Sequence, residues 1–210
     1  MQEGTLFFLF SWLAVWSIIF MGNNPAQKRS GQLAVLLTII MCAGTYINIV
    51  QIQINLIWLP VFIWSFFQWR TIQKGNVFLV SVSVFGVMIA FSCFRILTML
   101  YPVWLFVDWK ILCSLLVVAS AAFFQREWKL RLSIVLIGSL LGQMIFAFLL
   151  NYNGMPIRYL FSSELLDLLS LIVLFNCIFH VLEHWMEIRA ARKSYMAQTW
   201  KNREMRQDNR

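Results

Sequence analysis

The stretch ILCSLLVVASAAFF, Ile111–Phe124, decides the fold class of this chain. It contains no charged residue, and polar and apolar residues do not alternate along it as they do in a strand of a membrane barrel. The stretch LFFLFSWLAVWSIIF, Leu6–Phe20, has the same character. A backbone in lipid must satisfy its own hydrogen bonds, which only helices and closed barrels achieve. Both stretches are therefore predicted to be membrane-spanning helices.

The composition of the whole chain agrees with lipid as its surroundings. Of the 210 residues, 60% are hydrophobic and 12% are charged, whereas soluble domains carry about 25% charged residues. A soluble fold of this length has too little interior to bury so much apolar surface. The ten Trp and nineteen Phe residues also suit membrane interfaces and apolar interiors. The composition therefore predicts an integral membrane protein.

Seven apolar stretches come close to the roughly 20 residues that a helix needs to cross a bilayer. They cover approximately residues 6–22, 33–50, 56–69, 77–96, a stretch ending near 124, 132–150 and 165–184. The pentapeptide QIQIN, Gln51–Asn55, is predicted to be a tight turn between the second and third spans. The segment 97–110 leads into the fifth span, and the sequence leaves open whether it is a loop, an interfacial helix or part of that span.

The distribution of positive charge predicts the orientation. With the N-terminus outside and the C-terminus inside, all of the 17 Lys and Arg residues except Arg95, Lys110 and Arg158 fall on the cytoplasmic side, where basic residues of membrane proteins accumulate. The expected fold is an all-α, multi-pass bundle of about seven helices in the cell membrane, comprising residues 1–184, with a basic cytoplasmic tail, 185–210. Because the net charge of +8 is dispersed over short clusters between apolar runs, no nucleic-acid partner is expected.

The segment FHVLEHWMEI, Phe179–Ile188, holds both histidines of the chain in an H-x-x-E-H pattern. His180 and His184 share one helical face, so they could ligate a metal with Glu187 as third ligand and Glu183 as the base that activates water. This pattern occurs in metalloproteases. The simpler interpretation is preferred: the seventh span leaves the hydrocarbon here, and polar residues are expected at that point. No metal site, no cofactor and no enzymatic activity is therefore predicted.

A second group of polar residues is expected at the external end of the bundle. It comprises Arg95, Asp108, Lys110, Arg158, Glu164 and Asp167. Ionisable residues within spans are costly and usually form pairs or line a cavity, so Arg95 is predicted to pair with Asp167 or Asp108. The group is either a structural ion pair at the rim or an outward-facing mouth that binds an anion or a peptide.

Neutral polar residues and glycines within the predicted spans indicate helix packing. Asn48, Gln143 and Asn176 are suited to hydrogen bonds across helices or, less commonly, to lining a solute route. The sequence GSLLG, Gly138–Gly142, places two glycines four residues apart, which allows a neighbouring helix of the bundle to approach closely.

The tail has apolar residues at near-helical spacing with arginines between them. This pattern is typical of a basic amphipathic helix on an anionic inner leaflet. Binding to an acidic protein partner and an ordinary solvated extension are the alternatives.

Three features together resemble the YphA-type membrane proteins of spore-forming Gram-positive bacteria. They are the first span ending in IIFMGNNP, the segment IVQIQIN between the second and third spans, and the basic tail. The resemblance implies residence in a bacterial membrane and no catalytic residue.

The leading functional hypothesis is a non-enzymatic membrane protein that acts as an assembly factor, sensor or partner protein. The first alternative is a small-solute permease that uses Asn48, Gln143, Asn176 and Arg95. The second alternative is a metal-dependent membrane hydrolase centred on His180, Glu183 and His184.

Overall fold

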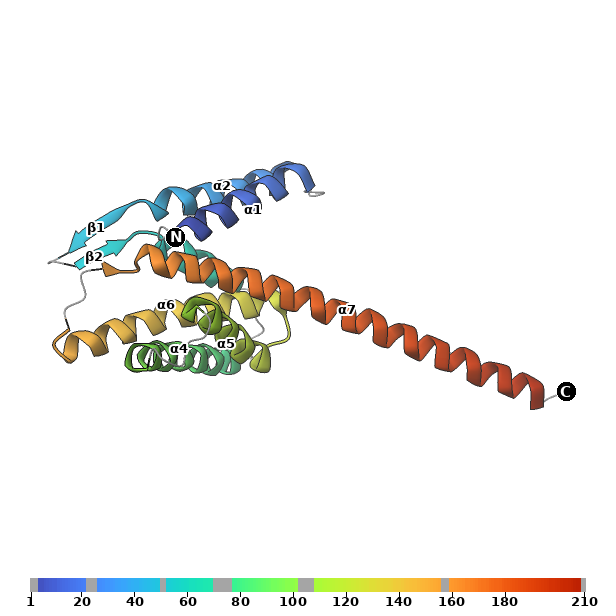
Figure 1. Ribbon diagram of the computed structural model, residues 1–210. Helices are drawn as coiled ribbons and strands as arrows, with labels where there is room; N and C mark the ends of the chain where they lie inside the picture. The colour runs from blue at the N-terminus through green and yellow to red at the C-terminus, as the bar shows by residue number, and fades with distance from the viewer. Residues whose placement is uncertain are drawn as a thin grey trace. The chain divides into compact units, whose positions relative to one another are not determined.

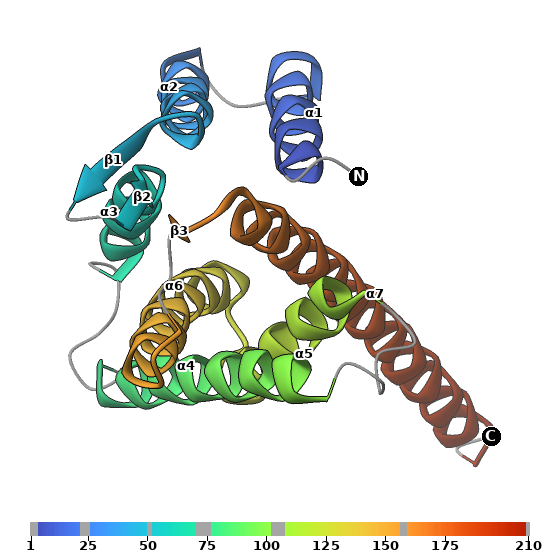
Figure 2. The same ribbon diagram turned by 60° about the vertical axis from the view of Figure 1, so that its left-hand side comes forward.

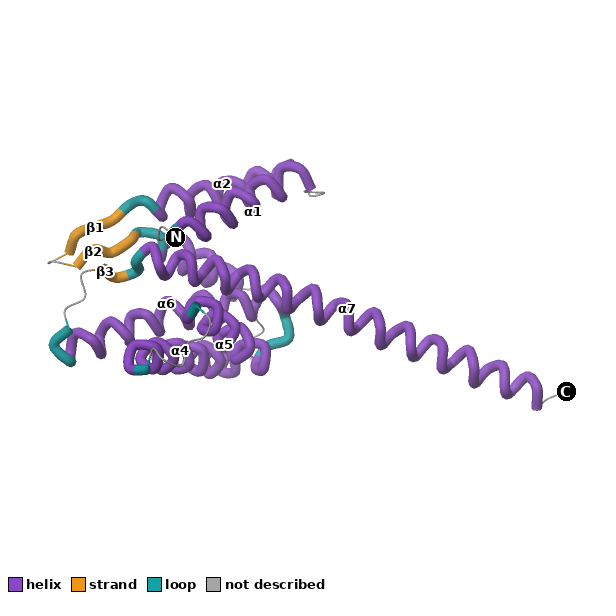
Figure 3. Tube along the Cα trace, in the orientation of Figure 1, coloured by secondary structure: helices purple, strands orange, loops and turns teal. Residues whose placement is uncertain are grey.

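The computed structural model describes residues 4–21, 26–49, 52–69, 77–101, 108–155 and 159–208. Within these residues the chain forms seven α-helices and three short β-strands (Figure 1, Figure 3). In chain order they are α1 (Thr5–Met21), α2 (Ala26–Ala43), β1 (Tyr46–Ile49), β2 (Ile52–Asn55), α3 (Trp58–Trp69), α4 (Val77–Leu100), α5 (Trp109–Phe124), α6 (Trp128–Tyr152), β3 (Tyr159–Leu160) and α7 (Ser163–Asp208).

The chain divides into two compact units, Met1–Phe175 and Asn176–Arg210. The first unit contains α1 to α6, the strands and the first turns of α7. The described residues of the second unit are the remainder of α7.

The core of the first unit is formed by α4, α5 and α6, which contact one another in all three pairs (Figure 2). α6 also contacts α3, and every residue from Leu130 to Leu140 on α6 is buried. Gly138 and Gly142 face α4: a Cβ atom added to Gly138 would lie 2.5 Å from Val87 Cγ1, and one added to Gly142 would lie 2.8 Å from Phe91 Cδ1. The two glycines therefore permit the close packing of α6 on α4, as the GSLLG sequence suggests.

A small sheet replaces the turn that was predicted for Gln51–Asn55. β1 and β2 pair antiparallel, with Tyr46 opposite Asn55, and β3 pairs parallel with β2 (Figure 3). The second predicted span is accordingly too long, because α2 ends at Ala43 and Tyr46–Ile49 is a strand. The predicted all-α bundle is confirmed for the seven described helices, and this sheet of two- to four-residue strands is an addition to it. The buried Asn55 joins these elements: its Nδ2 donates to the Ala43 carbonyl (2.8 Å), and its Oδ1 accepts from the Ile57 N–H (2.9 Å).

Three helical segments of the described residues are long and apolar enough to cross a membrane: α4, α6 and Ser163–Ala190 of α7. The third predicted span, 56–69, is not among these three segments. α3 has 12 residues, which gives about 18 Å at 1.5 Å per residue, whereas the hydrocarbon core is about 30 Å thick. α4 extends to Leu100 and α5 begins at Trp109; the part of the predicted connection between 102 and 107 lies outside the described residues.

The surface is far more apolar than that of a soluble protein, while the core is mostly apolar as well. Large apolar side chains lie on the surface, among them Phe78 (80% exposed), Phe123 (87%) and Phe148 (71%). Some polar side chains are buried among the apolar ones, including Ser114 on α5 and Ser133 on α6. Arg131, which stands just before the predicted span 132–150, is fully buried within α6. Such an arrangement suits a bundle whose outer surface contacts hydrocarbon, because exposed rings cost nothing there and buried polar groups find partners inside.

Candidate functional site

Asp167 is the centre of the charged site at the beginning of α7. Its side chain is buried, and its two carboxylate oxygens accept hydrogen bonds from two backbone N–H groups at the start of α1. Gly4 donates to Oδ2 (2.9 Å) and Phe7 donates to Oδ1 (3.1 Å). The first amides of a helix have no partner within the helix, and a negative charge is favoured at this end of it. Asp167 therefore caps α1 from a different helix.

Lys110, on the first turn of α5, supplies the opposite charge. Its Nζ lies 3.7 Å from Asp167 Oδ2, and its side chain is 16% exposed. Asp108 immediately precedes α5 and caps it, since its Oδ1 accepts a hydrogen bond from the Lys110 N–H (3.1 Å). The beginnings of α1, α5 and α7 are thus joined through polar groups.

Arg95 on α4 pairs with Glu164, not with Asp167 or Asp108 as predicted. Its Nη2 lies 3.6 Å from Glu164 Oε2. Its guanidinium carbon lies 4.0 Å from the centre of the Trp109 ring and 5.1 Å from the centre of the Phe146 ring. Aromatic faces attract a guanidinium group most strongly where water is excluded. Arg95, Lys110, Glu164 and Asp167 are called the charged cluster below. Arg158, which was predicted to join it, lies outside the described residues.

The neutral polar residues lie on different elements. Asn48 is on β1, not within a span, whereas Gln143 is buried on α6 and Asn176 is on α7 in the second unit. Among the described residues, Gln143 Oε1 has no hydrogen-bond partner. Two serines hydrogen-bond to other helices: Ser92 donates to the Gly142 carbonyl (2.9 Å) and Ser133 donates to the Ser65 carbonyl (3.1 Å).

The histidine segment lies on α7 in the second unit. His184 and Glu187 are exposed, and His180 and Glu183 are half-buried. Within the described residues, no three His, Cys, Asp or Glu side chains are grouped so that they could hold one metal ion. The four cysteines, all within the described ranges, are free thiols.

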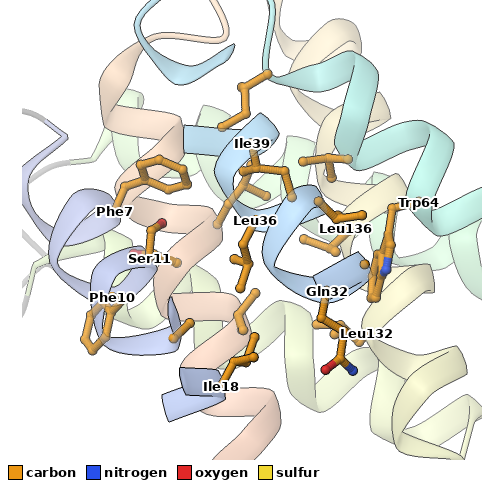
Figure 4. A pocket seen from close by; sticks show the side chains of 18 residues that line it. Phe7, Phe10, Ser11, Ile18, Gln32, Leu36, Ile39, Trp64, Leu132 and Leu136 are labelled. Carbon is orange, nitrogen blue, oxygen red and sulfur yellow. The ribbon is translucent and has the colours of Figure 1, made fainter. Parts of the chain in front are cut away.

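The first unit also contains an apolar cavity of about 780 Å³, which the sequence did not predict (Figure 4). Side chains from α1, α2, α3, α6 and α7 line it, including Phe7, Leu36, Trp64, Leu136 and Leu169. Ser170 also lines the cavity, and it lies one helical turn from Asp167, to whose carbonyl it donates a hydrogen bond (2.7 Å). The cavity and the charged cluster are thus adjacent along α7.

An outer surface of exposed aromatic rings, several buried polar side chains and three helices of membrane-crossing length define a helical integral membrane protein. The family model of the YphA-like integral membrane proteins matches residues 3–205, so the chain belongs to this family and the resemblance seen in the sequence is confirmed. No curated protein and no solved structure matches the chain.

Proposed function

We propose that this chain is a multi-pass protein of the bacterial cell membrane that acts by binding a partner and not by catalysis. Its seven helices cross or enter the bilayer, with the N-terminus outside and the C-terminus in the cytoplasm. The last part of α7 is the element that an acidic cytoplasmic protein binds, which makes the chain an assembly factor, a sensor or a partner subunit.

The length of α7 carries this proposal. The helix has 46 residues, or about 69 Å at 1.5 Å per residue, more than twice the thickness of the hydrocarbon core. The part that is long and apolar enough to cross a membrane lies within Ser163–Ala190. The helix then continues to Asp208 through a sequence that contains Arg192, Lys193 and Lys201. A regular helix that continues past the membrane with excess positive charge is suited to an acidic partner surface.

The side chains of the charged cluster already contact one another and the backbone, which supports a structural role for them. Asp167 is occupied by two backbone N–H groups and Lys110, and Arg95 is held by Glu164 and two aromatic rings. Side chains that hold one another in this way fix the relative positions of α1, α4, α5 and α7. Their role is therefore to stabilise the fold of a protein that acts by binding.

The orientation is tested by protease accessibility of an epitope at the C-terminus. Protease added outside intact cells should leave the epitope in place, and permeabilised cells should lose it. Removal of the epitope from intact cells would refute the orientation and the cytoplasmic partner with it.

The partner is tested by crosslinking in intact cells followed by affinity capture of the full chain. A variant with Arg192→Gln, Lys193→Gln, Lys201→Gln and Arg203→Gln should lose most of the captured protein, and the wild-type interaction should weaken at high salt. The matched control, Lys193→Arg with Lys201→Arg, preserves the charge and should capture as the wild type does. The proposal is contradicted if the neutralised variant captures as much protein as the wild type. It is also contradicted if the tail binds anionic vesicles but captures no protein.

A further inference from the structure

The apolar cavity of the first unit has the size and chemistry of a ligand site. Its volume of about 780 Å³ lies within the range of roughly 300–1,000 Å³ that is usual for sites that bind small molecules and cofactors. Five helices contribute to its wall, and hydrocarbon side chains make up most of it. Since few polar groups face the cavity, a polar solute would lose its hydration there without compensation. The residues that line the cavity therefore favour a hydrocarbon ligand over a polar one.

The cavity has a closed end and an open end. At the closed end, which adjoins Asp167, the lining residues Phe7, Ile57 and Leu169 are buried. At the other end Gly31 and Gln32 are exposed. Figure 4 shows Phe7 and Ile39 near one end of the cavity and Ile18 and Gln32 near the other. From Phe7 to Ile18 the lining follows α1 for about 16 Å, taking 1.5 Å per residue.

This shape favours an extended hydrocarbon chain over a helix from a partner protein. A helical segment about 16 Å long and roughly 10 Å across occupies about 1,250 Å³, which exceeds the volume of the cavity. An extended hydrocarbon chain is narrower and fits the depth. In a protein of an integral membrane family, such chains surround the bundle.

The open end of the cavity lies beside the first turns of α2. This position indicates the charge of the polar group that a bound hydrocarbon chain would carry. Lys28 and Arg29 are on the first turn of α2, and Ser30 separates them from Gly31 and Gln32 in the sequence. The N-terminus of a helix favours negative charge, and two basic residues on the same turn add to this preference. Gly31 leaves open space at the rim, since a Cβ atom added there would meet nothing within 4 Å.

We propose that the cavity binds one anionic phospholipid, with its acyl chains between α1, α2, α3, α6 and α7 and its phosphate at the beginning of α2. Under the orientation proposed above, the phosphate lies at the cytoplasmic leaflet, where anionic lipids carry the negative surface potential. The lipid site is independent of partner binding by the tail, so one can fail while the other holds.

The test is native mass spectrometry of the full-length protein, delipidated in detergent and titrated with phosphatidylglycerol or phosphatidylcholine of identical chains. The wild type should bind one phosphatidylglycerol with an affinity about tenfold or more above that for phosphatidylcholine. Ala14→Trp places a large ring in the cavity and should abolish this binding. The matched control, Ala34→Trp, makes the same change at an exposed position of α2 outside the lining and should bind as the wild type does.

Two further variants keep the test decisive if Ala14→Trp does not fold. Val35→Trp obstructs the cavity from an exposed position and should weaken binding by about tenfold or more. Lys28→Gln with Arg29→Gln should remove the preference for the anionic lipid, whereas Arg192→Gln with Lys193→Gln removes the same charge from the tail and should not. The proposal would be overturned if Val35→Trp bound phosphatidylglycerol as the wild type does, or if the wild type bound the two lipids with equal affinity. It would also be overturned if the protein formed a dimer without lipid and that dimer did not bind lipid.

Discussion

Asp167 on α7 accepts a hydrogen bond from the backbone N–H of Gly4, which stands 163 residues earlier in the chain, with an N···O distance of 2.9 Å. Helices in soluble proteins are usually capped by a neighbouring residue or by water. Lipid offers no hydrogen-bond partner in place of water, and an unsatisfied backbone group costs several kcal/mol in hydrocarbon. A carboxylate from a distant helix therefore both closes α1 and determines where α1 packs.

Asp167→Ala should be the most destabilising single substitution in the charged cluster. It leaves two N–H groups without an acceptor and leaves Lys110 without its partner. Removal of one member of a buried pair costs about 3–5 kcal/mol, and unfolding in mixed micelles, titrated with dodecyl sulfate, should show a loss of this size. The control is Glu164→Gln: its side chain is 31% exposed, and the loss should stay below about 1 kcal/mol. Equal losses for the two variants would contradict the capping role of Asp167.

Gly4→Ala should destabilise the same junction through the backbone. Gly4 has φ of +92°, and an added Cβ atom would lie 3.4 Å from Ser163 Cβ. A residue with a side chain is strained by about 1–2 kcal/mol at such positive φ values, so the free energy of unfolding should fall by about that amount. Gly44→Ala is the control, since its added Cβ atom would meet nothing within 4 Å. A loss of stability for Gly44→Ala as large as that for Gly4→Ala would count against this explanation.

The sequence predicts which parts of the chain are helical but not which helices face one another. An uncharged apolar run such as Ile111–Phe124 identifies α5 because lipid allows it few other structures. The depth of Arg95 also follows from its position near the end of a span. Its partner does not: Glu164 and Asp167 are one helical turn apart, and only the rotation and tilt of α7 decide that Arg95 reaches Glu164 and Lys110 reaches Asp167.

The small sheet carries a signal that was available in the sequence. Ile47, Ile49, Ile52 and Ile54 alternate with polar neighbours within each strand, and this period of two is typical of strands. Each strand has only four residues, so the alternation is short and lies between much longer apolar runs. The cavity has no comparable signal. It is formed by the imperfect closure of five helices, and residues such as Phe7 and Leu136 look like ordinary core residues in the sequence.

Gly138→Ala should weaken the packing of α6 on α4, and a second substitution should restore it. The added Cβ atom would lie 2.5 Å from Val87 Cγ1 and 2.8 Å from Val87 Cβ. Overpacking of this kind costs about 1–3 kcal/mol. Val87→Ala removes the nearer obstructing atom, so the double variant should be more stable than the sum of the two single losses predicts, by about 1 kcal/mol in a double-mutant cycle. Gly86→Ala, whose added Cβ atom would make only an ordinary contact with Phe124 at 3.5 Å, is the control. If the losses of stability of Gly138→Ala and Val87→Ala were strictly additive, the side chains at these two positions would not be in contact.

Arg95→Lys should cost about 1–2 kcal/mol although it preserves the charge, because the site of Arg95 is defined by flat surfaces as well as by Glu164. The guanidinium group lies 4.0 Å from the centre of the Trp109 ring and 5.1 Å from that of Phe146. A planar, weakly hydrated guanidinium group stacks on such rings, whereas an ammonium group is compact and strongly hydrated. The contact with Trp109 is worth about 0.5–2 kcal/mol, so Arg95→Lys and Trp109→Leu should show coupled losses in unfolding titrations. Glu164→Gln isolates the aromatic contribution: if Arg95→Lys is harmless both in the wild type and in the Glu164→Gln background, the aromatic contact does not hold Arg95 in place.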